Sequence, residues 1–365
     1  MSTDVERANT AASFVLAPAA AQSTASTIAA TQRPNGEIPW FDGGHTDPWD
    51  HVEAAMGLDT QGMHDRAAMA YRWLESVQNS DGSWWRGYQD GVPSDLVRET
   101  NFTAYLAVGL WHHYLSTGDE DLLHALWPTV RRAMEFVLAR QQGSGEVWWA
   151  LGRHGQPATE ALVTGCSSIY QAVRCALRIA ELCEHPRPDW ELSAARLGHA
   201  VVAHPELFSP RDRFSMDWYY PILSGTLTGS AARRRLAASW DTFVVDGLGA
   251  RCVSDQPWVT GAETAELVLA LAATGRREDA ALLLGWMQHL RHDDGSYWTG
   301  YVYPDDAFWP EERTTWTSGA VLLADAFLRD DPATVAVFGH GQGPVAPDEA
   351  ACLRCCSRSG LRAAR

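Results

Sequence analysis

The sequence is short of positive charge. Its 365 residues contain 29 Lys and Arg against 45 Asp and Glu, and the formal net charge is −16 at pH 7. A protein that binds nucleic acid through its phosphates needs a basic face, so we expect no nucleic-acid partner. Anionic substrates are disfavoured for the same reason. Long apolar runs are missing too: no stretch approaches the ~18–20 apolar residues of a spanning helix, and we expect no membrane contact.

Paired cysteines and targeting signals are also lacking. Residues 1–22 have no basic region ahead of their short apolar patch, so we expect no secretory signal. The seven cysteines are odd in number and scattered, as at Cys166, Cys175 and Cys252, which is typical of reduced thiols in a cytoplasmic protein. The segment CLRCC (352–356) has no second Cys or His pair nearby, so we expect no zinc site there.

Motifs for nucleophilic, metal and phosphate chemistry are absent as well. The chain has no Gly-x-Ser-x-Gly, no helical His-x₃-His and no Gly-rich phosphate loop. We therefore expect no metal and no cofactor. What the chain has in excess is tryptophan, with 17 copies. Because the indole N–H needs a partner when buried, so many indoles suggest a cleft lined with flat amphipathic rings.

The sequence repeats one unit. SVQNSDGSWWRGYQDG (76–91) is echoed by HLRHDDGSYWTGYVYPDD (289–306), and more loosely by residues 31–44 and 140–155. Each copy lies between two helical stretches, and two looser units surround residues 211–229 and 241–275. The chain thus reads as six helix–loop–helix units of roughly 50–60 residues.

The two helices of each unit differ in polarity. The second is apolar on all sides and must be buried, whereas the first has a polar stripe and lies outside. Six inner and six outer helices predict an all-α, closed (α/α)6 toroid of six helical hairpins; an open α-solenoid would need polar capping repeats, which we do not find. We expect one domain over residues 1–335 and a flexible tail over 336–365.

The toroid gathers the aromatic loops at one rim, with the N-terminal ends of the inner helices. For Trp84 and Trp298, an alternative is that the ring wedges between neighbouring helices. The aromatic residues expected at the rim are Trp49, Trp84, Trp85, Trp148, Trp149, Trp218, Tyr219, Tyr220, Trp258, Trp298, Trp309 and Trp316.

The Asp-Gly-Ser-Trp element (81–84) resembles the repeats of squalene–hopene cyclases and protein prenyltransferase β-subunits. The chain lacks both the Asp-x-Asp-Asp motif of the first family and the Asp, Cys and His zinc ligands of the second, so the resemblance implies a fold and no chemistry. Residues 28–330 also resemble six-hairpin glycoside hydrolases, and among them the actinobacterial endo-α-1,4-mannosidases that accompany methylmannose polysaccharide synthesis. That resemblance implies hydrolysis of an α-linked saccharide by two carboxylates.

The inner-helix starts contain several carboxylates. Glycoside hydrolysis needs one acid to protonate the leaving oxygen and a second carboxylate to activate water or attack the sugar. Our predicted pair is Asp47 and Glu263, with Asp50 as the substitute for Asp47. The alternative is that these acids only cap helices, because Asp47 precedes a helix start and Thr260 with Glu263 spells a capping box.

Further residues are predicted to bind the saccharide. They are the rim aromatics other than Trp85, Trp148 and Trp149, together with His45, Arg98, Glu99, Asp217 and Arg313. For the last four, the alternative is that they form structural ion pairs. Two other functions stay open: a terpenoid cyclase or prenyltransferase-like enzyme, whose carbocations also suit a Trp-lined cavity, and a non-catalytic glycan-binding toroid. A uronate lyase would need a Tyr or His base in a basic pocket. The sequence leaves a homodimer open.

Overall fold

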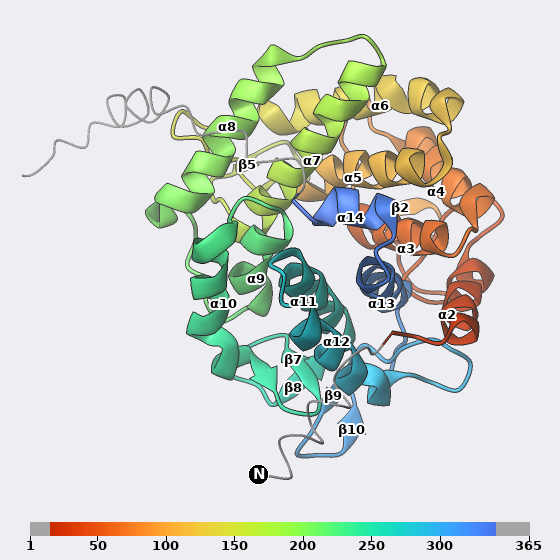
Figure 1. Ribbon diagram of the computed structural model, residues 1–365. Coiled ribbons are helices and arrows are strands. Elements are labelled where there is room, and N and C mark those ends of the chain that lie inside the picture. The colour runs from red at the N-terminus through yellow and green to blue at the C-terminus, as the bar shows by residue number, and fades with distance from the viewer. Residues whose placement is uncertain (1–14, 341–365) are drawn as a thin grey trace, which may run out of the picture.

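Helices dominate the computed structural model, which describes residues 15–340. Among these residues, six inner helices contact one another in a closed cycle, in the order α3, α5, α7, α9, α11, α13 and back to α3 (Figure 1). The inner helices are α3 (Pro48–Thr60), α5 (Thr100–Thr117), α7 (Val163–Leu182), α9 (Ser215–Leu223), α11 (Gly261–Ala273) and α13 (Thr315–Leu328). The predicted closed toroid is confirmed.

Outer helices surround this ring, and each packs on the inner helix of its own or the neighbouring unit. They are α2 (Pro18–Thr31), α4 (His64–Val77), α6 (Glu120–Leu138), α8 (Pro188–Ala203), α10 (Gly229–Phe243) and α12 (Arg277–Trp286), with short 3₁₀ turns η1 (Pro205–Leu207) and η2 (Met287–Leu290). The polarity difference explains the two layers: α11 is buried from Gly261 to Ala272, whereas α6 buries one face and exposes the other.

Small residues let the inner helices approach closely. A Cβ atom on Gly57 of α3 would lie 2.8 Å from the Cα atom of Gly319 in α13. Glycine is therefore required where these two backbones cross, and this contact joins the first unit to the last and closes the ring.

Among residues 15–340, one helix lies outside the sixfold repeat. Helix α14 (Pro332–Phe338) crosses the end of the ring where the inner helices finish (Figure 1), and its Phe338 is buried. His112 Nε2 lies 3.1 Å from Thr334 Oγ1, and Gln171 Nε2 donates to the Val337 carbonyl at 3.2 Å. Helix α14 thus covers the C-terminal ends of the inner helices. Residues 341–365, which include the CLRCC segment, lie outside the described residues.

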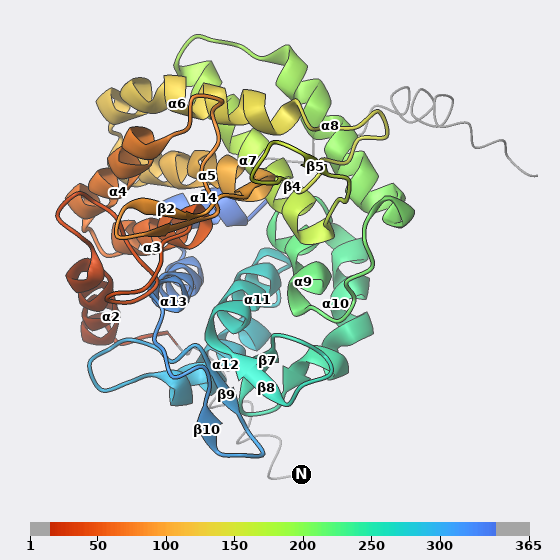
Figure 2. The same ribbon diagram turned by 180° about the vertical axis from the view of Figure 1, so that it is seen from behind.

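Short antiparallel strands occupy the loops at the opposite end (Figure 2). They form a pair, a three-stranded sheet ordered β3-β4-β5 and a five-stranded sheet ordered β10-β9-β8-β7-β6. Their bounds are β1 (Gly87–Gln89), β2 (Val92–Asp95), β3 (Arg98–Glu99), β4 (Ala150–Leu151), β5 (Pro157–Ala158), β6 (Val244–Val245), β7 (Gly249–Arg251), β8 (Trp258–Thr260), β9 (Gly300–Val302) and β10 (Ala307–Phe308). Because β3 runs directly into α5 and β8 into α11, the sheets fix where those helices begin.

Membrane insertion finds no support among residues 15–340, where each helix is too short or too polar to cross a bilayer.

Candidate active site

Buried carboxylates from two inner helices meet at the strand-bearing end of the ring. Asp47, Asp50 and Glu53 come from the start of α3, and Glu263 and Glu266 from the first turns of α11; all five are buried. The two helices flank α13. Charges on Glu53 and Glu266 both act on Asp50, so the acids of the two helices form one group, which we call the carboxylate cluster.

Asp47 begins α3 as its N-cap. Its Oδ1 accepts a hydrogen bond from the Asp50 amide at 3.0 Å, and its Oδ2 accepts one from the Trp40 indole at 2.6 Å. Burial raises the pKa of Asp47, while these two hydrogen bonds and the nearby His45 oppose the rise. The His45 ring packs against Trp40, with centroids 4.4 Å apart. The capping role of Asp47 is therefore real, and it leaves both carboxylate oxygens engaged.

Asp50 is in the opposite situation. Its Oδ2 is buried and has no hydrogen-bond partner among the described residues. Burial raises the pKa of Asp50 well above its ordinary value, and the charges of Asp47 and Glu53 raise it further. The raised pKa favours the protonated form of Asp50, which is the form that a general acid needs.

Glu53 and Glu266 lie deeper in the cluster. The Trp49 indole donates to Glu53 Oε2 at 3.1 Å, and the Tyr219 hydroxyl donates to Glu266 Oε2. Burial raises the pKa of Glu53 to about 7 and that of Glu266 well above its ordinary value. Both side chains are almost inaccessible to solvent. We therefore interpret Glu53 and Glu266 as supporting groups, whose charges help to raise the pKa of Asp50.

Glu263 stands in the first turn of α11. The expected Thr260–Glu263 capping box is wrong, because the Thr260 side chain makes no capping hydrogen bond. The Gly261 amide, the first of α11, donates to the Thr299 carbonyl of the neighbouring loop at 2.9 Å. The Glu263 carboxylate instead lies beside the Cys252 thiol, whose pKa is raised by burial and then by this carboxylate. Glu263 is therefore not needed to start its helix.

Glu99 also approaches the cluster, from the start of α5. Burial raises the pKa of Glu99 to about 7, the Arg86 guanidinium 3.5 Å away opposes the rise, and the Asp47 charge adds to it. Arg98 next to it has other partners: it forms an ion pair with Asp81 at 2.7 Å and lies over the Trp85 ring. We did not predict Arg86 and Trp40 as site residues from the sequence. Their place in the repeated aromatic loops was the only sequence signal for them.

Two other predicted ligands have partners of their own. Asp217 accepts a hydrogen bond from Thr164 Oγ1 at 2.5 Å, which links α9 to α7. Arg313 pairs with Asp294 at 2.5 Å and donates to Ser296 Oγ at 2.8 Å. Neither residue appears among the groups that shift the pKa values of the cluster.

The predicted aromatic residues divide into packing and rim groups. Trp84 and Trp218 are packing residues, because both are buried and donate to the carbonyls of Leu74 and Arg235. Trp49, Tyr219 and Tyr220 are buried beside the carboxylates, and the half-buried Trp316 lies next to Glu53. Trp258, Trp298 and Trp309 lie in or beside the five-stranded sheet, and Trp309 is 56% exposed.

The rim tryptophans contact one another and a neighbouring phenylalanine. Trp258 meets Trp309 edge to face, with centroids 5.0 Å apart, and donates to its carbonyl at 2.8 Å. Trp298 stacks on Phe308 at 5.1 Å. Trp298 therefore packs on a strand of the loop sheet.

Known proteins resemble the chain in both sequence and structure. No family model matches it. It is 51% identical over 319 residues to the MMP endo-(1,4)-3-O-methyl-alpha-D-mannosidase of Mycolicibacterium hassiacum, covering 87% of this chain and 89% of that protein. A glycosidase solved in complex with glucose superposes with a TM-score of 0.68 at 18% identity, over 85% of this chain and 96% of the other. A D-mannose isomerase gives a TM-score of 0.66 at 11% identity over the same shares, and these two structures establish the fold alone.

Proposed function

We propose that this chain, which belongs to the family of the MMP endo-(1,4)-3-O-methyl-alpha-D-mannosidase, cleaves internal α-1,4 bonds of a 3-O-methylated mannan. The chain is a glycoside hydrolase. The observation that carries the substrate is the 51% identity, which extends over 87% of the chain and so includes both helix starts of the carboxylate cluster.

Asp50 is our proposed proton donor. An α-mannosidic bond breaks when the leaving oxygen receives a proton as positive charge develops on the sugar. Asp50 has a raised pKa and an oxygen without a hydrogen-bond partner, whereas both oxygens of Asp47 are engaged. Asp47 then holds the helix start in position through its hydrogen bonds to the Asp50 amide and the Trp40 indole.

Glu263 is the second proposed carboxylate. It faces the same cluster from α11 and does not serve as a helix cap. As a base it deprotonates the attacking water, or as a nucleophile it attacks the anomeric carbon; the separation of the two groups in a saccharide complex decides between these routes. In either route, Asp50 supplies the proton to the departing sugar.

The rim aromatics suit a methylated sugar. Stacking on an indole buries the C–H face of a hexose, and a 3-O-methyl group adds apolar area that unmethylated mannose lacks. Trp309 is exposed and Trp258 lies against it, so this pair is the proposed platform for sugar residues beyond the cleavage point.

The substrate proposal is tested with three sets of oligomers: α-1,4-linked 3-O-methylmannose, unmethylated α-1,4-mannose and prenyl diphosphates. Mass spectrometry of the products should show shortening of the methylated oligomers into internal fragments and no change in the prenyl diphosphates. Turnover of a prenyl diphosphate would favour the cyclase-like alternative, and binding without cleavage would favour the glycan-binding toroid.

A cytoplasmic location and a homodimer complete this proposal. The former is supported by Cys166, Cys175, Cys183 and Cys252, which are free thiols. Light scattering of the purified chain tests the latter, since a mass near 40.1 kDa would mean a monomer.

A further inference from the structure

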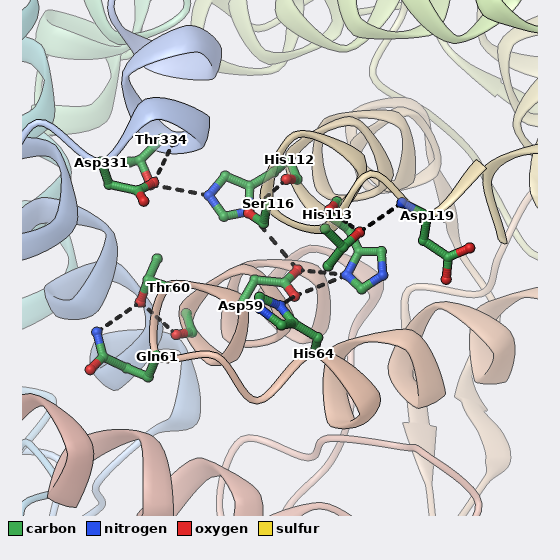
Figure 3. Close-up of polar contacts among 12 residues, drawn as sticks. Asp59, Thr60, Gln61, His64, His112, His113, Ser116, Asp119, Asp331 and Thr334 are labelled. Carbon is green, nitrogen blue, oxygen red and sulfur yellow. Dashed lines mark hydrogen bonds and ion pairs between the residues drawn. The ribbon is translucent and has the colours of Figure 1, made fainter. Parts of the chain in front are cut away.

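A second group of ionisable side chains occupies the other end of the ring, where the inner helices finish. Asp59 lies in the last turn of α3, His64 begins α4, and His112 and His113 lie near the end of α5 (Figure 3). We call these four residues the Asp59 cluster. Segments that are distant in sequence thus bring three imidazoles to one carboxylate.

The distances within the Asp59 cluster are short. His64 Nδ1 and His113 Nδ1 each lie 2.9 Å from Asp59 Oδ1, and His113 Nδ1 lies 3.0 Å from Oδ2. The donor atoms of Asp59, His64 and His113 all fall within 4.8 Å of one another. In a tetrahedral zinc site, with bonds near 2.0–2.1 Å, neighbouring ligand atoms are about 3.3 Å apart. Small side-chain rotations therefore convert this set into a zinc site.

His112 gives an independent sign of a ligand. Its Nε2 faces Thr334 Oγ1 at 3.1 Å, which directs Nδ1 towards Asp59 Oδ2 at 4.0 Å. Nδ1 is fully buried and has no hydrogen-bond partner among the described residues. A buried nitrogen acceptor or donor without a partner is unfavourable and calls for an explanation. An ion between His112 and Asp59 supplies one.

We propose that the Asp59 cluster binds one zinc ion, with Asp59, His64 and His113 as ligands and His112 completing the fourth position. Imidazole nitrogen and carboxylate oxygen are ordinary zinc ligands, and four protein ligands make a closed, structural site. The ion takes the place of the imidazole protons that now point at Asp59. His64 is 39% exposed on its side chain, so it provides the route by which the ion enters.

The role of this ion is structural. It joins the end of α3, the start of α4 and the end of α5, and His112 extends the connection through Thr334 to α14. Thr334 Oγ1 in turn donates to Asp331 Oδ2 at 2.7 Å, at the start of α14. The site lies at the opposite end of α3 from the carboxylate cluster, so it clamps the covered end of the ring and takes no part in hydrolysis.

The experiment uses full-length protein without a histidine tag, stripped with EDTA and dialysed. Wild type, His64→Ala and the control His124→Ala, which alters an exposed histidine of α6, are each incubated with equimolar zinc chloride and passed through a desalting column. Elemental analysis should find about one zinc per chain in wild type and His124→Ala, and calorimetry should show at least tenfold weaker binding by His64→Ala. Circular dichroism checks that each variant is folded.

Cobalt substitution gives a second measurement that needs only the wild-type chain. Four-coordinate Co²⁺ absorbs strongly in the visible range, so its spectrum reports the geometry as well as the stoichiometry. Three outcomes would each overturn the proposal. Wild type could retain no zinc, His64→Ala and His124→Ala could bind zinc with equal affinity, or cobalt could give the weak spectrum of a six-coordinate ion.

Discussion

Helix α3 has a buried aspartate near each end, and the two aspartates have opposite surroundings. Near its start, burial and the charges of Asp47 and Glu53 raise the pKa of Asp50. At its end, burial works against ionisation of Asp59, but the adjacent imidazoles outweigh it and hold the pKa of Asp59 low. Burial is therefore common to both, and the neighbours decide the sign. At the N-terminal end of α3, neighbouring carboxylates repel one another and give Asp50 the raised pKa that catalysis needs. At the C-terminal end, Asp59 is paired with imidazoles.

The substitution with the largest expected effect at the N-terminal end of α3 is Asp50→Asn. Asparagine keeps the shape and cannot donate an acid proton, so we expect kcat on methylmannose oligomers to fall about 10²–10⁴-fold. Stability should stay level or rise, because asparagine is neutral at every pH and fits a site where burial and the neighbouring carboxylates disfavour an ionised Asp50. Steady-state kinetics and thermal unfolding measure the two effects. The control is Asp65→Asn on the exposed face of α4; an active Asp50→Asn enzyme would assign the proton donor elsewhere.

Glu263→Gln tests whether α11 contributes a catalytic residue to the carboxylate cluster. We expect a fall in kcat of about 10²–10³-fold with little change in stability, because Glu263 does not cap its helix. The anomer that the wild-type enzyme first releases, read by NMR, assigns the role: retention of configuration identifies Glu263 as the nucleophile, and inversion identifies it as the base. If Glu263→Gln lost stability and kept its activity, Glu263 would be a packing residue.

At the C-terminal end of α3, where Asp59 is paired with imidazoles, removing the carboxylate should lower stability rather than leave it level. Asp59→Ala leaves three imidazoles without their carboxylate, and we expect a loss of about 3 kcal/mol in the free energy of unfolding. Urea unfolding in the presence of EDTA measures it without any contribution from metal. The matched control Asp65→Ala should change stability by less than about 0.5 kcal/mol. An unchanged urea midpoint in Asp59→Ala would mean that the pairing contributes nothing.

The raised pKa of Glu53 makes the stability of the carboxylate cluster depend on pH. Its pKa is raised from 4.5 to about 7 in the folded chain, so between these values the folded state binds more protons than the unfolded one. The resulting stability is complete below pH 4.5 and is lost as the pH rises through 7. Glu53→Gln should remove this loss and gain on the order of 2 kcal/mol relative to wild type between pH 5 and 8. Urea unfolding at both pH values tests it; a constant difference between the two proteins would contradict the raised pKa.

The repeat and the helix polarity were enough to predict the toroid, because inner helices such as α11 are apolar on every side. The cap at Asp47 followed from local sequence and is confirmed, whereas the Thr260 side chain makes no capping hydrogen bond, and the first amide of α11 donates to Thr299 of a distant loop. Sequence also gave no sign of the Asp59 cluster, since α3, α4 and α5 supply it at irregular spacing. Local rules thus reach as far as contacts within a unit and stop where separate units meet.

The smallest expected effect belongs to Asp47→Asn, which separates the two roles that the start of α3 combines. Asparagine caps a helix as well as aspartate does, so the free energy of unfolding should change by less than about 0.5 kcal/mol. The variant loses a charged acceptor for the Trp40 indole and a negative charge beside Asp50. We therefore expect kcat to fall only about tenfold, the effect of weakening one charge-assisted hydrogen bond. Parallel kinetics of Asp47→Asn and Asp50→Asn decide the assignment: a larger loss in Asp47→Asn would exchange the roles, making Asp47 the reacting group and Asp50 its support.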